Sequence, residues 1–162
     1  MRRLLIIATA LALLIATVGS MSALAGNRRP MSGGFTVAVV PVGQRCGPNA
    51  LTIGFEGAGH ATHLGRMTGT GSNCTEFGLA TESVGIWDGI ATYVAADGSS
   101  ITVAYEGLQQ QPSNGAATTT TSNTVIGGTG RFSGVEGAWD GTGVIDFSTG
   151  LFTGTISGWI DY

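Results

Sequence analysis

Apolar residues and glycines alternate with polar residues along the last part of the chain, and this alternation constrains the fold most. From Trp139 to Ile145, and again from Phe152 to Ile160, every second residue is apolar or glycine, and the residues between them are mostly polar. A period of two is that of a β-strand with one buried face. Glycines on that face are typical of tightly curved sheets, because they relieve crowding where strands coil. Two strands of a curved antiparallel sheet are therefore predicted.

The upstream sequence continues this pattern as short β-type runs separated by turn signals, with no helical period. Composition agrees, since glycine occurs 28 times and threonine and serine are also abundant, a mixture that suits strands and tight turns. Eight or nine strands at this spacing predict an all-β domain, either a closed barrel or a sandwich. The seven upstream runs are 35–40, 51–56, 61–69, 74–80, 85–95, 101–107 and 118–126, with a turn expected at 71–73.

Residues 1–25 are typical of a secretory signal peptide. An Arg-Arg pair precedes the uncharged apolar run Leu4 to Val18, and Ala-Leu-Ala ends the segment as a small-x-small cleavage site. The apolar run is shorter than the roughly 20 residues that span a bilayer as a helix. We expect cleavage near Ala25 and export to the periplasm, cell surface or medium, without stable membrane insertion afterwards. An uncleaved membrane anchor is the alternative.

The remainder of the chain is long enough for one domain with one core. We expect a flexible N-terminal arm over 26–34 and the β domain over 35–162. This part has five arginines, no lysine and ten acidic residues, which gives a net charge of −5. Nucleic acids and anionic membranes are bound by clustered cations, so neither is expected as a partner. A homo-oligomer is compatible with the sequence.

Cys46 and Cys74 are the two cysteines of the chain. A cysteine pair in an exported protein usually forms a disulfide, and this pair lacks the CxxC spacing of a metal site. We therefore predict a Cys46–Cys74 disulfide, with metal or nucleophile chemistry as the alternative.

The segment 127–137, GGTGRFSGVEG, is the most specific motif. It lacks the GxGxxG spacing of a dinucleotide loop, and no lysine is present for a phosphate loop. We interpret it as a turn that needs several residues with positive φ, anchored by Phe132. Followed by two β-runs joined by a tight turn, it resembles the GGTGxF-x-x-x-x-G element of the allene oxide cyclase and dirigent barrel superfamily, including small exported bacterial members.

This resemblance covers mainly residues 118–162 and implies an eight-stranded antiparallel β-barrel. Plant members of the superfamily cyclise an epoxide fatty acid or steer phenoxy-radical coupling, and bacterial relatives include cyclases of polyketide-type products. No catalytic pattern of those enzymes matches this sequence position by position. The resemblance therefore predicts the fold and leaves the activity open.

The chain has two histidines, which lie close together in the segment EGAGHATHLGR at 56–66. We expect His60 in a turn facing solvent and His63 half-buried in a strand, hydrogen-bonded to a neighbour. Glu56 with both histidines is a weaker metal candidate, because residues three apart in a strand face opposite sides. His63 with Arg66, as a general acid or base beside an anion clamp, is the catalytic alternative.

Several aromatic residues are candidates for a pocket that binds a small apolar ligand: Trp87, Tyr93, Tyr105 and Trp139. Plain core packing is the alternative for these side chains. Trp87 and Tyr93 share strand parity, so we expect them on one face. Glu56 and Glu106 are acidic candidates, because a carboxylate inside a barrel has a raised pKa and can act as an acid.

Two functions are consistent with these features. The first, which we favour because no converging set of polar residues is evident, is a non-catalytic binding or structural module for a small apolar ligand. The second is a cofactor-free cyclase or isomerase in which His63 or a carboxylate assists. No cofactor motif and no GxSxG, HExxH or SxxK nucleophile or metal motif is present. An open cavity with charged candidates pointing inward would favour the enzyme.

Overall fold

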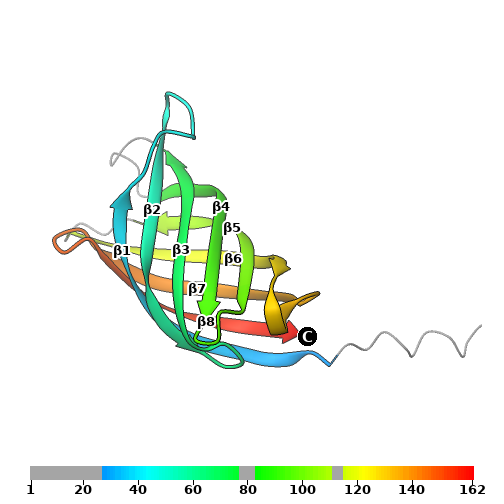
Figure 1. The fold of residues 1–162 in the computed structure, drawn as a ribbon. Helices are drawn as coiled ribbons and strands as arrows, with labels where there is room; N and C mark the ends of the chain where they lie inside the picture. Colours follow the sequence, from blue (N-terminus) through cyan, green and yellow to red (C-terminus); the bar gives the residue numbers. More distant parts are fainter. Residues whose placement is uncertain (1–26, 77–82, 111–114) are drawn as a thin grey trace, which may run out of the picture.

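The computed structural model describes residues 27–76, 83–110 and 115–162, which form a closed barrel of eight antiparallel strands (Figure 1). Each strand pairs with its neighbours in sequence, and β1 also pairs with β8, which closes the barrel. The predicted eight-stranded antiparallel barrel is thus confirmed, whereas the predicted signal peptide lies outside the described residues. The elements are β1 (Arg29–Pro41), β2 (Ala50–Ala61), β3 (Gly65–Glu76), β4 (Ser83–Ala95), β5 (Ser100–Gln110), β6 (Ala116–Gly128), η1 (Gly130–Phe132), β7 (Glu136–Asp146) and β8 (Leu151–Asp161).

The alternation predicted for the last two strands is present. On β8, Gly154, Ile156 and Ile160 are buried, whereas Thr153 and Thr155 are exposed. The buried face of each strand points into the barrel, and the outer face carries many threonines and serines. Alternation of this kind fixes the register, because a slip of one residue would exchange the two faces.

Two local predictions differ from the structure. β1 begins at Arg29 instead of Phe35, because the residues expected to form a loose arm pair with the end of β8, as in Arg29 with Ile160. The turn expected at 71–73 lies inside β3. There Gly71 makes room for the Phe55 ring of β2, since a Cβ at this glycine would lie 2.5 Å from the ring.

A β-bulge interrupts the pairing of β4 with β5 between Ile86 and Gly89. Asp88 within it has a φ of 52°, an uncommon conformation that aspartate tolerates better than most residues. The extra residue changes the inward parity of β4, so that Ile86 and Gly89 are both buried while Trp87 and Asp88 are exposed. Because of the bulge, the Trp87 side chain lies on the outer face of β4, whereas the Tyr93 side chain lies on the inner face.

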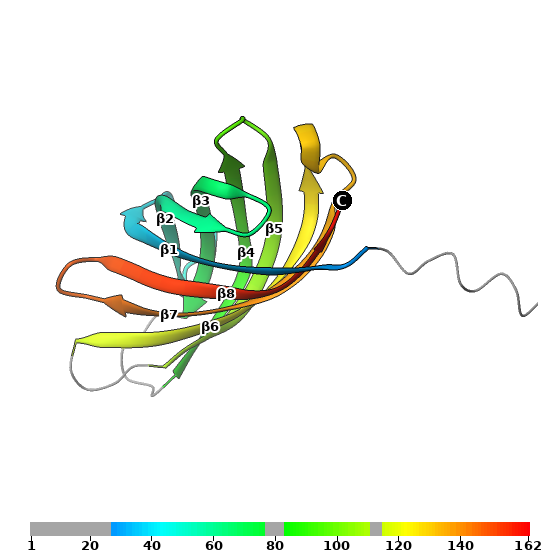
Figure 2. The same ribbon diagram turned by 90° about the horizontal axis from the view of Figure 1, so that it is seen from below.

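One end of the barrel is filled by side chains, and we call it the closed end. The start of β1, the segment around η1 and the C-terminus lie together there (Figures 1 and 2). Phe132 is fully buried as the anchor predicted from the GGTGRF segment, and Gly130 and Gly134 have φ values of 60° and 77°. Arg131 donates hydrogen bonds to the His63 and Leu64 carbonyls, both at 3.2 Å, which ties this segment to the β2–β3 turn.

The opposite end, which we call the open end, carries the loops between β1 and β2 and between β7 and β8. The compact core lies toward the closed end, and several aromatic rings pack against it from the middle of the barrel. This arrangement leaves space in the half of the barrel nearer the open end.

Candidate functional site

The barrel encloses a cavity of about 120 Å³ that runs from the middle of the barrel toward the open end. Its wall is mainly apolar and receives side chains from all eight strands. The residues that line it are Phe35, Val37, Val39, Ile53, Phe55, Asn73, Thr75, Ile86, Tyr93, Tyr105, Gln109, Thr119, Thr121, Asn123, Gly141, Ile145, Phe152 and Ile156.

The floor of the cavity, where it meets the closed-end core, is formed around Tyr93. The Tyr93 ring lies against Gly69 of β3, where a Cβ would come within 2.9 Å of it. Behind it, the Trp139 ring packs with its centroid 6.4 Å from that of Tyr93. Trp139 is only 3% exposed and belongs to the core, so it supports the floor without lining the cavity.

The polar groups of the cavity wall are uncharged at neutral pH, and several are paired within the protein. The Tyr105 hydroxyl donates a hydrogen bond to Asn73 Oδ1 at 3.0 Å, and Asn73 Nδ2 donates to the Cys74 carbonyl. Asn123 Nδ2 donates to Thr121 Oγ1 at 3.0 Å and to the Trp139 carbonyl at 3.2 Å. These bonds fix both asparagine side chains, so the polar part of the wall is preorganised.

Burial makes both phenols of the cavity harder to ionise. It raises the pKa of Tyr93 to about 12. Burial also raises the pKa of Tyr105, the nearby Tyr93 raises it further, and Arg45 opposes the shift. Both hydroxyls therefore remain protonated over the whole physiological range and can act as hydrogen-bond donors.

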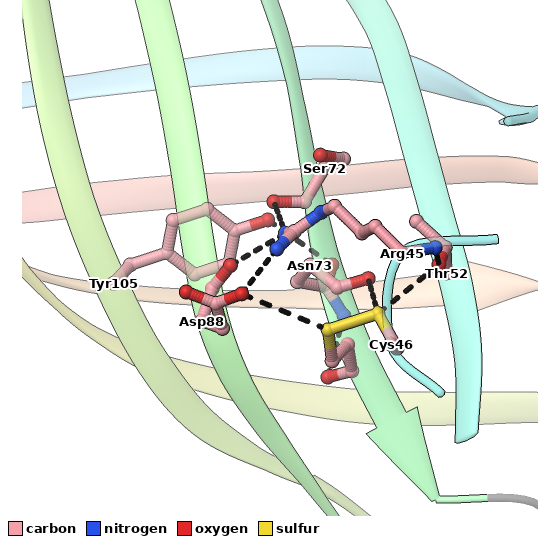
Figure 3. A network of polar contacts seen from close by, with 8 residues as sticks. Arg45, Cys46, Thr52, Ser72, Asn73, Asp88 and Tyr105 are labelled. Carbon is pink, nitrogen blue, oxygen red and sulfur yellow. Dashed lines mark hydrogen bonds and ion pairs between the residues drawn. A yellow bond between two sulfur atoms is a disulfide. The ribbon is translucent and has the colours of Figure 1, made fainter. Parts of the chain in front are cut away.

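A polar network holds the β1–β2 loop on the outside of the barrel near the open end (Figure 3). The Cys46–Cys74 disulfide joins this loop to β3, as predicted. Arg45 forms an ion pair with Asp88 in the β4 bulge and donates to the Ser72 carbonyl at 3.2 Å. Because the Arg45 and Asp88 side chains are 34% and 62% exposed, the ion pair adds little stability, and the disulfide dominates the attachment.

Two of the four predicted ligand-binding aromatics line the cavity. Tyr93 and Tyr105 project into it from β4 and β5, Trp139 lies behind the floor, and Trp87 is 37% exposed on the outside. The prediction that Trp87 and Tyr93 lie on the same face of their strand is wrong, because the bulge at Asp88 inserts an extra residue between them.

The four weak catalytic candidates do not come together in the cavity. Glu56 and Glu106 are exposed on the outer faces of β2 and β5, and Arg66 is exposed on β3. His63 lies at the closed end, where its Nε2 is 3.1 Å from the Pro30 carbonyl and its Nδ1 is 3.3 Å from the Tyr162 hydroxyl.

The two histidines exchange their expected secondary structure, but His60 faces solvent and His63 is half-buried and hydrogen-bonded, as predicted. His60 is an exposed strand residue of β2, whereas His63 occupies the β2–β3 turn with a φ of 72°.

Within the ranges 27–76, 83–110 and 115–162, no three His, Cys, Asp or Glu side chains gather in a way that could hold a metal ion. In the same ranges, no helix has the length and apolar character needed to cross a membrane.

Sequence reasoning missed the amide and aliphatic hydroxyl residues of the cavity wall, namely Asn73, Thr75, Gln109, Thr119, Thr121 and Asn123. Strand parity is the signal that could have found some of them. Thr119, Thr121 and Asn123 share one face of the threonine-rich run 118–126, and that face points inward. Asn73 was missed as a residue of the wall because 71–73 was expected to form a turn, whereas it is part of β3.

This geometry defines a class of protein: a small antiparallel β-barrel with an apolar internal cavity whose few polar groups are uncharged. Among solved structures, the chain is similar to the pterocarpan synthase dirigent protein PsPTS1, with a TM-score of 0.51 and 17% identity over 83% of this chain and 96% of that chain. At this identity the similarity shows the fold alone, so the chain has the dirigent-like barrel fold. No family model matches the sequence, and no curated protein does.

Proposed function

We propose that this protein is an exported, non-catalytic binding module that holds a small, uncharged, largely apolar molecule inside its barrel. The observation on which the proposal rests is the apolar cavity of about 120 Å³, which is lined by residues of every strand and lies beside a separate, well-packed core. A cavity of similar size, about 150 Å³, is enough for a benzene-sized molecule when its walls are apolar.

The chemistry of the wall supports an uncharged ligand. Among the described residues, no Asp, Glu, Arg or His side chain lines the cavity, and the only ionisable groups that they bring to its wall are the phenols of Tyr93 and Tyr105. A charged molecule would lose its hydration without gaining an opposite charge, which is unfavourable. The described part of the wall offers no Asp, Glu or His side chain for acid–base catalysis, which favours binding over the cyclase alternative.

Two features support export. The Cys46–Cys74 disulfide is of the kind that persists in oxidising compartments, and the N-terminal sequence is typical of a cleavable signal peptide. The similarity to the dirigent protein supports only the barrel fold on which this proposal is based. The synthase activity in the name of that protein is not assigned to this chain.

Native mass spectrometry of the protein purified from its own host tests the proposal. We expect a mass increment above that of the processed, disulfide-bonded chain, corresponding to a small neutral molecule that organic solvent extracts. The variant Ile145→Trp, which fills the cavity from β7, should abolish the increment.

Val144→Trp is the matched control, because Val144 is the preceding residue of the same strand but is 48% exposed on the outer face. We expect it to retain the increment. Absence of any bound molecule in the wild-type protein, or equal retention by both variants, would count against binding inside the barrel.

A further inference from the structure

The Tyr93 hydroxyl at the floor of the cavity has no hydrogen-bond partner among the described residues. Around it the other polar groups are occupied: Tyr105 donates to Asn73, and Asn123 donates to Thr121. Gln109 and Thr119 also lack side-chain hydrogen bonds within the described ranges, but they pair across β5 and β6 nearer the open end, farther from the closed-end core than Tyr93. Tyr93 is therefore the unoccupied donor deepest in the barrel.

A second donor without a partner belongs to Trp139, whose ring packs against that of Tyr93. Trp139 Nε1 is the one buried side-chain polar atom of the described chain that makes no hydrogen bond. Buried polar groups are rarely left unpaired, and each exception calls for a bound molecule, water or strain. Trp139 does not line the cavity, so its Nε1 is not open to a ligand there, whereas the Tyr93 hydroxyl belongs to a residue of the cavity wall and is the donor that a ligand could meet.

We infer that the ligand of this cavity is a neutral molecule with an apolar ring or short chain and one acceptor oxygen, such as a carbonyl, that receives a hydrogen bond from the Tyr93 hydroxyl. This inference rests on the proposed function, since it names the chemistry of the molecule bound in the same cavity. The raised pKa of Tyr93, caused by burial, keeps this hydroxyl protonated as a donor. The apolar residues Phe35, Phe152 and Ile156 would contact the rest of the molecule.

Two probes of nearly equal size test the inference: acetophenone, which has a carbonyl, and ethylbenzene, which has a methylene in its place. Their dissociation constants are measured by calorimetric titration for the wild-type protein, Tyr93→Phe and Tyr162→Phe. We expect Tyr93→Phe to weaken acetophenone binding roughly 3- to 10-fold, the usual range for one neutral hydrogen bond, and to change ethylbenzene binding less than about twofold. Tyr162→Phe, which removes a hydroxyl at the closed end, should change neither.

The infrared carbonyl stretch of bound acetophenone gives a readout that a purely structural effect would not produce. It should lie at lower wavenumber in the wild-type protein than in Tyr93→Phe. An equal loss of affinity for both probes, or no loss together with an unshifted band, would overturn the inference while leaving cavity binding intact. Failure of the wild-type protein to bind either probe would instead overturn the proposed function, and the inference with it.

Discussion

Individual residues decide which chemistry the barrel interior supports. Among the residues that the structure describes, Tyr93 and Tyr105 bring the only ionisable groups into a mainly apolar cavity, and burial raises the pKa of both. The sequence predicted these two tyrosines because they are large and have strand positions. It did not predict Asn73, whose place on β3 depends on pairing with distant segments, and it misplaced Trp87 because a one-residue bulge is a local departure from strand periodicity.

The raised pKa of Tyr93 predicts a loss of stability in alkali. In the unfolded chain the phenol ionises near pH 10, whereas in the folded chain its pKa is about 12. Below pH 10 the hydroxyl is protonated in both states and its contribution to stability is complete. As the pH rises from 10 toward 12 the unfolded state releases its proton first, so the free energy of unfolding falls.

Denaturant unfolding at pH 9 and pH 11 measures this effect. We expect Tyr93→Phe to lose less stability than the wild type between these two pH values, by about 1 kcal/mol. Equal losses in the wild type and Tyr93→Phe would show that Tyr93 is not shielded from water.

The strands and loops show which parts of the fold follow from local sequence. The alternation on β7 and β8 and the turn around Phe132 were predictable, because both depend on neighbouring residues. The early start of β1 was not, since Arg29 to Ser32 become a strand only by pairing with the far end of the chain. The β1–β2 loop similarly depends on long-range partners: its position is fixed by the Cys46–Cys74 disulfide and by Arg45.

The disulfide is expected to be the main attachment of that loop. Replacing both cysteines with alanine should lower the free energy of unfolding by about 3–4 kcal/mol, because the bridge closes a loop of roughly 30 residues in the unfolded chain. Denaturant unfolding of the wild type and the double variant measures the difference. Arg45→Met, which removes the exposed ion pair with Asp88 and the hydrogen bond to the Ser72 carbonyl but keeps the disulfide, should cost clearly less than the double cysteine variant, about 1 kcal/mol.

Thiol labelling of the wild-type protein without reductant is the companion measurement. It should modify no cysteine, and two labelled cysteines would refute the bridge. A double variant as stable as the wild type would show that other contacts hold the loop.

At the scale of the whole molecule, the barrel combines a solid closed end with a hollow half. The sequence predicted the barrel through its strand count and its GGTGRF segment, and the dirigent-like structure agrees with that fold. It did not predict the cavity, because the volume left in a barrel depends on how side chains from all eight strands meet. Fold and cavity together support a binding role, while the outward positions of Glu56, Glu106 and Arg66 do not support catalysis inside the barrel.

The central claim is that the space inside the barrel is a binding site, and a crystal structure of the protein saturated with ethylbenzene tests it most directly. We predict electron density for the probe between Phe35, Tyr93 and Ile156, with the strands of the barrel unchanged. An interior filled by the protein's own side chains, or density for the probe only on the outer surface, would contradict the claim.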